Sequence, residues 1–245
     1  MESLLDVTGV TMHFGGSVAL HDVALTAATG TITGLMGPNG AGKTTMFNCI
    51  TGLITPSSGE IRLDGRDIAK LPPFKRARRG ISRTFQRLEL FTSLSVRDNI
   101  AVAGQIRNRW HHSSVDVHDK ARDVMNKLGL LSIADREVTE IPTGTARRVE
   151  VARALMTDPK LLLLDEPASG QDDRETEAFG DLLLTLADDG MGILLVEHDV
   201  PFVFRLCSLV HVLDFGRIIA SGTPDVIRTD QKVVDAYLGA VKATA

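Results

Sequence analysis

A glycine-rich run with the spacing G-x-x-x-x-G-K-[ST] extends from Gly37 to Thr44. Glycines let the backbone curl so that successive N–H groups converge on phosphate oxygens, and the start of a following helix adds partial positive charge. In such a loop Lys43 reaches the β- and γ-phosphates of a nucleotide, and the Thr44 hydroxyl ligates Mg²⁺. The predicted phosphate-binding residues are Gly37, Pro38, Asn39, Gly40, Ala41, Gly42, Lys43, Thr44 and Thr45.

Two carboxylates, Asp165 and Glu166, follow the apolar run 161–164, which is typical of a buried parallel strand. Ligands of α/β sheets bind beyond the carboxyl ends of such strands, so we expect both side chains at the phosphate site. Asp165 suits the Mg²⁺ sphere, directly or through water, and Glu166 can accept a proton from the attacking water. On its own the pair would be a solvated turn. After a phosphate loop it predicts nucleotide hydrolysis.

The elements that must hold these groups follow from hydrophobic periodicity. Alternating residues predict antiparallel strands at 4–10 and 18–27, and apolar runs predict buried strands at 31–36 and 193–196 in addition to 161–164. A helix at 44–50 follows the phosphate loop, and a helix ending at Gly190 links the last two strands as a parallel βαβ unit.

Shorter elements complete the α/β part of the chain. A strand at 61–63 turns at Asp64-Gly65, strands at 209–213 and 218–221 form a hairpin, and Thr223-Pro224 is an N-cap and first-turn pair for a closing helix.

Between about 92 and 156 the pattern changes to helices. Val117, Ala121, Val124 and Leu128 recur at helical spacing, with Gly129 as a stop. A further helix is expected from about Ala146 to Met156. This segment is predicted to be a helical insert within the α/β core.

Composition bounds the function classes. The chain has 245 residues, 43% of them hydrophobic, which suffices for one α/β domain with a substantial core. Its net charge of −4 gives phosphate backbones no general attraction, so no nucleic-acid partner is expected. The N-terminus lacks signal-peptide features and the apolar runs are too short to cross a bilayer, which predicts a cytosolic chain with Cys49 and Cys207 as reduced packing residues.

A third motif, Leu195-Val196-Glu197-His198-Asp199, follows the strand after Asp165-Glu166-Pro167. With the phosphate loop, these features resemble the ATPase subunit of an ABC transporter over essentially the whole chain. The resemblance implies ATP and Mg²⁺ as cofactors and an α/β fold with a RecA-like core, an antiparallel β subdomain and a helical subdomain. One domain, 1–245, is expected, with the core at about 1–91 and 157–222, the helical subdomain at 92–156 and C-terminal helices at 223–241.

Further roles follow from the same resemblance. Gln86, in Arg83-Thr84-Phe85-Gln86, resembles the glutamine that senses the γ-phosphate, the metal and the attacking water. His198 resembles the switch histidine that contacts the γ-phosphate, and Phe14 resembles the aromatic residue that stacks on adenine. The run 169–172 takes the place of a loop that meets the partner subunit. As isolated residues, a Phe is usually core, a His at a strand end usually packs, and a loop Gln is usually solvated.

The finer resemblance is to the ATPase of branched-chain amino-acid importers. It rests on Phe14-Gly15-Gly16, on the Arg83 to Gln86 motif, on the run from Arg147 to Leu155 and on Ala236-Tyr237-Leu238-Gly239. One departure concerns the family signature, Leu-Ser-Gly-Gly-Gln or a variant of it, where this chain has Ile141-Pro142-Thr143-Gly144-Thr145. That segment caps the ATP of the opposite subunit, so Thr143, Gly144 and Thr145 are the expected partner-site residues.

The implied partners are a second ABC ATPase subunit, identical or homologous, membrane-spanning permease subunits and a substrate-binding protein, which predicts a peripheral position at the cytoplasmic membrane face. The basic cluster from Lys75 to Arg87 is expected to be a solvated face with a few contacts to the membrane partner. Three alternatives stay open: an exporter ATPase of the lipopolysaccharide-extraction kind, a weakly hydrolysing regulatory subunit, and an ABC ATPase of translation or DNA repair without a membrane partner.

Overall fold

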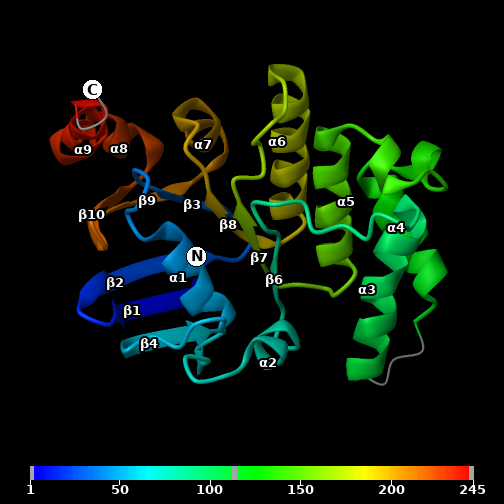
Figure 1. Cartoon of the computed structure of the whole chain (residues 1–245), viewed down its shortest axis with the longest axis horizontal. Helices are drawn as coiled ribbons and strands as arrows, with labels where there is room; N and C mark the ends of the chain where they lie inside the picture. The colour runs from blue at the N-terminus through cyan, green and yellow to red at the C-terminus, as the bar shows by residue number, and fades with distance from the viewer. Residues whose placement is uncertain (1–2, 112–114, 243–245) are drawn as a thin grey trace.

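The computed structural model describes residues 3–111 and 115–242, which form an α/β fold with helices at both ends of two sheets (Figure 1). The strands are β1 Ser3–Phe14, β2 Ser17–Ala28, β3 Ile32–Met36, β4 Ser58–Leu63, β5 Arg66–Asp67, β6 Ile81–Arg83, β7 Leu161–Asp165, β8 Gly192–Val196, β9 Leu209–Asp214 and β10 Arg217–Gly222. The α-helices are α1 Lys43–Thr51, α2 Pro73–Ala77, α3 Val96–His111, α4 Val117–Lys127, α5 Thr143–Leu155, α6 Asp173–Asp188, α7 Val200–Leu206, α8 Pro224–Thr229 and α9 Gln231–Lys242.

The larger sheet has the strand order β10-β9-β3-β8-β7-β6, and only β10 runs antiparallel to its neighbour. Its apolar runs are buried on both faces, which explains their lack of alternation. Leu162 and Leu164 of β7 join a core with helices α3 to α7, whereas Leu161 and Leu163 face α1 and the other sheet. The predicted parallel strands are confirmed.

The smaller sheet, β2-β1-β4-β5, is antiparallel, as the alternating residues predicted. Its inner face, including Val7 and Leu25, packs with Phe47 of α1 and Leu35 of β3 in one apolar core. Helix α1, which follows the phosphate loop, is therefore packed between the two sheets. This packing fixes its direction relative to the ends of the strands in the larger sheet.

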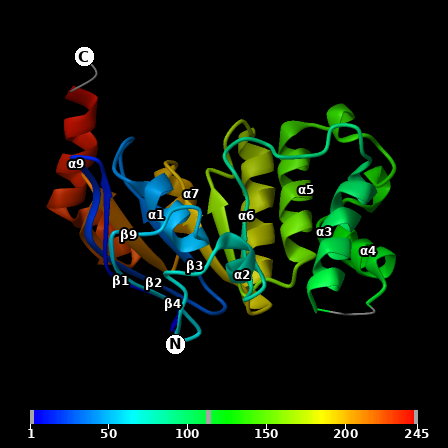
Figure 2. The same cartoon turned by 60° about the horizontal axis from the view of Figure 1, so that its bottom comes forward.

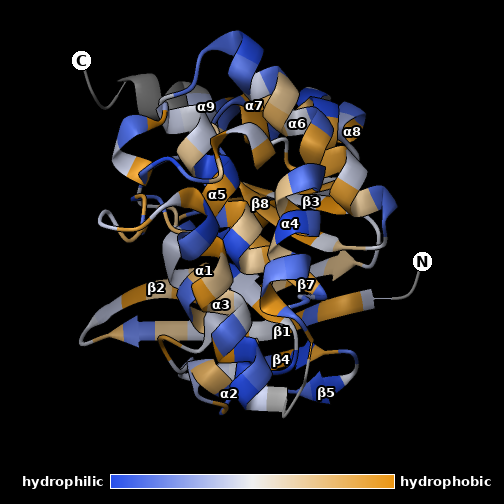
Figure 3. Ribbon diagram, turned by 90° about the vertical axis from the view of Figure 1, so that its right-hand side faces the viewer, coloured by the Kyte–Doolittle hydropathy of each residue, from blue (hydrophilic) through white to orange (hydrophobic). Residues whose placement is uncertain are grey.

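The helices α3, α4 and α5 lie at the opposite end of the molecule from α8 and α9 (Figure 2). Viewed from that end, hydrophilic residues colour much of α4, while the central strands behind it are hydrophobic (Figure 3). Asp116 caps α4 by accepting hydrogen bonds from the N–H groups of His118 and Asp119. Within the two described ranges, no helix combines the length and apolar character needed to cross a membrane.

One expected helix start is wrong in detail. Helix α5 begins at Thr143, three residues before the expected Ala146, with Pro142 as its N-cap. The first N–H groups of a helix need no intrahelical partner, so Thr143, Gly144 and Thr145 are tolerated there despite weak helix propensity. The expected start of α8 is confirmed, since Thr223 is its N-cap and Pro224 its first residue, although the Thr223 side chain makes no capping hydrogen bond.

A buried histidine joins the two sheets. In β9, Nε2 of His211 lies 3.2 Å from both the backbone nitrogen and the carbonyl oxygen of Thr26 in β2, and Nδ1 lies 2.8 Å from the Ser221 hydroxyl in β10. Burial lowers the pKa of His211, and the Thr26 backbone contact acts in the opposite direction. These contacts fit a neutral ring, in which one nitrogen donates and the other accepts.

This pKa shift predicts a pH dependence of stability. Because the folded pKa lies below the unfolded value, the unfolded state binds the proton first, and the free energy of unfolding falls as the pH drops below about 6.5. His211→Gln should reduce that slope by up to about 1.4 kcal/mol per pH unit. Denaturant unfolding at several pH values between about 7.5 and 5.5 would measure the slope of the free energy of unfolding against pH. The control is His21→Gln, which changes an exposed histidine. Equal slopes in all three proteins would contradict a neutral buried His211.

Candidate nucleotide-binding site

The phosphate loop connects the end of β3 to the start of α1, as its sequence predicted. Gly37 has φ 151°, and a Cβ there would lie 2.0 Å from the Leu213 carbonyl oxygen. Gly42 caps α1 with φ 111°, where a Cβ would lie 2.9 Å from the Ala19 carbonyl oxygen of β2. Only glycine fits both positions, so the curl of the loop is fixed by close packing on β2 and β9.

The cation of the loop is Lys43. Its Nζ donates to the carbonyl oxygens of Gly37 at 2.7 Å and Pro38 at 3.0 Å, and the residue is buried. Burial lowers the pKa of Lys43, whereas the charges of Glu166 and Asp165 act to raise it. The fold therefore brings the lysine within electrostatic reach of both predicted carboxylates.

Both carboxylates lie at the carboxyl edge of the larger sheet. Asp165 ends β7 opposite Val196 of β8, and the Glu166 N–H donates to the Val196 carbonyl at 2.9 Å. Glu166 has φ 47°, an uncommon conformation for a residue with a side chain, and this hydrogen bond helps to hold it. Gln86 Nε2 donates to Glu166 Oε2 at 2.8 Å. Two residues from segments 80 positions apart are thus joined directly.

Asp165 is paired with Arg83, which belongs to the run that the sequence predicts to be a solvated basic face. Arg83 Nη2 lies 2.7 Å from Asp165 Oδ2, and both side chains are less than 10% exposed (7% and 8%). The expectation of a solvated Arg83 is therefore wrong, because the last residue of β6 faces the end of β7.

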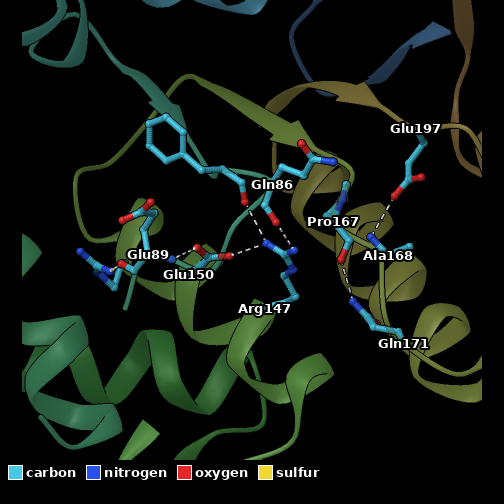
Figure 4. A network of polar contacts seen from close by, with 10 residues as sticks. Gln86, Glu89, Arg147, Glu150, Pro167, Ala168, Gln171 and Glu197 are labelled. Carbon is cyan, nitrogen blue, oxygen red and sulfur yellow. Dashed lines mark hydrogen bonds and ion pairs between the residues drawn. The ribbon is translucent and has the colours of Figure 1, made fainter. Parts of the chain in front are cut away.

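A second unforeseen residue is Glu197, which is buried between two loops. Its Oε1 accepts from the Ala168 N–H at 2.9 Å, and its Oε2 accepts from the His198 N–H at 3.2 Å. Burial raises the pKa of Glu197 while these two N–H donors act to lower it. Figure 4 shows Glu197 beside Ala168, with Gln171 donating to the Pro167 carbonyl at 2.7 Å. Glu197 ties the loop after β7 to the histidine segment after β8.

His198 and Phe14, two further predicted site residues, are largely exposed. His198 has a 63% exposed side chain, with Nδ1 3.7 Å from Glu197 Oε2, so it is not a buried packing residue. Phe14 is 50% exposed at the β1–β2 turn, which contradicts the core alternative for its ring. Its hairpin continues to Ala19, which packs on Gly42 of the phosphate loop. Thr44 is exposed and Thr45 is half-buried in the first turn of α1.

The signature segment 141–145 leads into α5, where Thr143 lies beside Gly170 of the loop 169–172. Pro142 and Thr143 are exposed, whereas Gly144 is buried, and a Cβ on Gly144 would lie 2.8–2.9 Å from the Glu175 carboxyl group. Glu175 belongs to the capping box that starts α6 with Asp172. Gly144 is therefore required for the close approach of two helix starts.

The next turn of α5 is hydrogen-bonded to the segment that carries Gln86. Arg147 donates to the carbonyl oxygens of Phe85 (2.8 Å) and Gln86 (2.5 Å) and pairs with Glu150 at 3.0 Å. Glu150 in turn accepts from the Glu89 N–H at 2.9 Å. Figure 4 shows this chain of contacts running from α5 to the loop. Side-chain pairing across 61 or 62 positions could not be read from sequence, although Arg147 and Glu150 belong to the run that carried the finer resemblance.

Comparison with known proteins agrees with this geometry. Residues 20–169 match the ABC transporter family model, and residues 217–243 match the model for branched-chain amino acid ATP-binding cassette transporters. The chain is 38% identical to the high-affinity branched-chain amino acid transport ATP-binding protein LivG of Salmonella typhimurium, over 97% of this chain and 98% of LivG. It is also 38% identical to the lipopolysaccharide export system ATP-binding protein LptB of Escherichia coli K12, over 92% and 93% respectively.

A solved structure shares both the fold and its extent. The ADP conformation of MJ1267, an ATP-binding cassette of an ABC transporter, superposes with a TM-score of 0.88 at 29% identity, covering 98% of this chain and all of that one (100%). The fold of this chain is thus that of an ATP-binding cassette. The chain belongs to the ATP-binding cassette family of ABC transporters.

Proposed function

We propose that this chain binds ATP with Mg²⁺ and hydrolyses it to drive import of branched-chain or related amino acids or amides. The observation that carries the hydrolytic part is the Gln86–Glu166 hydrogen bond, at 2.8 Å, at the strand edge beside Lys43. It supports the proposal because a carboxylate able to accept a proton and an amide able to orient water are hydrogen-bonded to each other near the Lys43 cation. The proposed architecture is one domain with the boundaries expected from the sequence.

Each loop residue has a proposed task. The backbone N–H groups of residues 37–45, except at Pro38, which has none, donate to phosphate oxygens, and Lys43 bonds the β- and γ-phosphates. The exposed Phe14 ring stacks on adenine. His198, exposed after β8 and held at its backbone by Glu197, contacts the γ-phosphate. These roles need surfaces open to a ligand, and Phe14 and His198 both have them.

The residues proposed for Mg²⁺ offer the right donor chemistry. Thr44, Asp165 and Gln86 supply hydroxyl, carboxylate and amide oxygens, which are the ligands this hard cation prefers. Arg83 uses only Oδ2 of Asp165, so the second carboxylate oxygen remains for the metal or its water. Bound there, the metal would neutralise charge developing on the phosphates.

The chemical step is a general-base hydrolysis. Gln86 holds Oε2 of Glu166 in place, and Glu166 accepts a proton from water that attacks the γ-phosphate, while the bond from the γ-phosphorus to the β,γ-bridging oxygen breaks and ADP leaves. The grip of Arg147 on the Phe85 and Gln86 carbonyls links this pair to α5, so movement of α5 is transmitted to the water-binding groups.

The partner-facing segment is the start of α5. In the proposed dimer, each subunit offers its α5 start to the γ-phosphate held by the other. Pro142 provides neither hydroxyl nor N–H, and Thr143 limits the close approach that glycine permits. We infer that a homodimer of this chain hydrolyses ATP slowly, and that a homologous ATPase with a fuller signature completes the site built on Lys43.

Restoring the signature should raise turnover of the isolated protein. The triple change Pro142→Ser, Thr143→Gly, Thr145→Gln is expected to increase steady-state ATP hydrolysis about 10-fold or more, since it adds preorganised donors to the transition state. Gly144 is kept because of its contact with Glu175. Glu166→Gln in the triple variant is the control and should cancel the gain. No increase, with folding and dimerisation intact, would refute the asymmetric-site hypothesis.

A groove between the sheet and the helical end is the proposed docking site of the permease. A cavity of about 330 Å³ is lined by α2, β6 and α5, with Phe85, Glu89 and Arg153 at its border. Phe74, Phe85, Leu88 and Phe91 are exposed large apolar residues of the segments beside it. Exposed apolar residues rimmed by charge are typical of interaction sites. Docking there would place the chain peripherally at the cytoplasmic membrane face.

Branched-chain or related cargo is favoured over lipopolysaccharide by the C-terminal match at 217–243 and by the longer coverage of LivG than of LptB. The exporter alternative keeps support from its equal identity of 38%. The weakly hydrolysing alternative rests on the unusual segment 141–145.

Co-purification of the native complex separates these functions. We expect permease subunits, a second ATPase and an amino-acid receptor when the tagged chain is extracted from membranes in mild detergent. Lipopolysaccharide-transport subunits would support the exporter alternative. Recovery with ribosomes or DNA-repair proteins, and with no permease, would contradict the transporter function.

A further inference from the structure

Arg83 joins three parts of the nucleotide site that are distant in sequence. From the end of β6, Nη2 donates to Asp165 Oδ2 at 2.7 Å, and Nη1 donates to Asn48 Oδ1 of α1 at 2.6 Å. The same residue begins the motif that ends in Gln86. The phosphate-loop helix, the carboxylate strand and the glutamine loop therefore meet at one guanidinium group.

The surroundings of Arg83 fix the plane of that group. Its Cζ lies 5.3 Å from the centroid of the Phe47 ring and 5.0 Å from that of Phe85. Both distances are in the range of cation–π contacts. Phe47 belongs to α1 and Phe85 precedes Gln86, so the rings connect the same elements as the hydrogen bonds. Arg83 Nε is buried without a hydrogen-bond partner among the described residues.

Burying such a pair is costly, because both ions lose water, and a well-packed apolar pair is often as stable. The Arg83 and Asp165 side chains are nonetheless 7% and 8% exposed. A role in orienting the site explains the arrangement better than stability does, since the outer partners of metal ligands commonly set ligand direction.

We propose that Arg83 is a positioning residue for ATP hydrolysis. It turns Asp165 so that Oδ1 faces the metal side, and it holds the Phe85–Gln86 segment at a fixed distance from the phosphate-loop helix. This inference rests on the proposed function of the site. Lysine cannot substitute, because one ammonium lacks the planar fork that bonds Asn48 and Asp165 while it stacks on the rings.

The test compares Arg83→Lys and Arg83→Gln with the matched changes at Arg79, an exposed arginine of the same basic run. The measurements are kcat and KM for ATP, ATP affinity with Mg²⁺ and with Mg²⁺ removed by EDTA, and thermal stability. The protein is the full chain, alone and in its native complex.

We expect Arg83→Lys to lower kcat by about 10–100-fold and to shrink the gain in ATP affinity that Mg²⁺ confers. Affinity without Mg²⁺ and the Arg79 variants should match the parent. Parental kcat in both Arg83 variants would overturn the proposal. So would a parallel loss of stability, metal-free affinity and turnover, or failure of both to fold, since Arg83 would then serve stability only.

The metal-dependent affinity separates this proposal from the proposed function. A parent protein that binds ATP without hydrolysing it would contradict the ATPase function. The Arg83 variants would still show whether Mg²⁺-dependent affinity needs the guanidinium. Conversely, normal hydrolysis and normal metal dependence in those variants would remove the Arg83 role and leave the ATPase function intact.

Discussion

Glu166→Gln should reduce ATP hydrolysis by about 10²–10⁴-fold while ATP still binds. The amide keeps the size of the carboxyl group and can still bond Gln86, whose Nε2 now donates to Glu166 Oε2 at 2.8 Å. It cannot accept the proton of the attacking water. Single-turnover hydrolysis at saturating ATP, together with equilibrium nucleotide binding, would measure the two effects separately.

The control for this change is Glu60→Gln, which alters an exposed carboxylate on β4 and should leave both the hydrolysis rate and the ATP affinity unchanged. Hydrolysis at the parental rate in Glu166→Gln would remove Glu166 from the catalytic role. Loss of ATP binding together with hydrolysis would instead mean that the left-handed turn at Glu166 (φ 47°) had collapsed.

Lys43→Ala should abolish most ATP binding. Lys43 lies within the predicted phosphate loop, where its ammonium group now bonds the Gly37 and Pro38 carbonyls at 2.7 and 3.0 Å. The variant would lose the two charge-assisted hydrogen bonds that Lys43 is proposed to make to the β- and γ-phosphates. At about 1.5–3 kcal/mol each, their loss corresponds to about 10²–10⁴-fold in Kd. Calorimetric titration with ATP in the presence of Mg²⁺ would measure it.

Lys160→Ala is the matched control, because this lysine pairs with Asp64 on the surface, away from the phosphate loop. It should bind ATP like the parent. Parental affinity in Lys43→Ala would refute the assignment of Gly37 to Thr45 as the phosphate-binding loop.

The parts predictable from sequence are those whose signal is local. The phosphate loop needs contiguous glycines, the apolar strand runs are continuous because both sheet faces are covered, and helix stops at Gly129 and Gly190 are single-residue features with φ of 68° and 96°. The short elements α2 and β6 were not predicted, since five and three residues are too few for a periodicity to be seen.

The contacts between loops could not be predicted, because they join residues far apart in sequence. Arg76 and Arg83 were expected in a solvated basic face. Arg76 is in fact 1% exposed, and it donates to the Cys49 and Ile50 carbonyls at the C-terminal end of α1. A guanidinium group there satisfies carbonyls that the helix leaves without partners. Charge density in the sequence does not distinguish such a buried arginine from a surface one.

We propose that ATP hydrolysis at the Lys43–Glu166 site drives amino-acid import. The most direct test of this proposal is uptake of radiolabelled leucine into proteoliposomes that contain the native complex, with receptor on one side and ATP on the side that carries this chain. We predict leucine accumulation that requires ATP and Mg²⁺ and that disappears in a complex with Glu166→Gln. Accumulation at the parental rate in that variant complex, or hydrolysis without leucine uptake in the parent, would contradict the account.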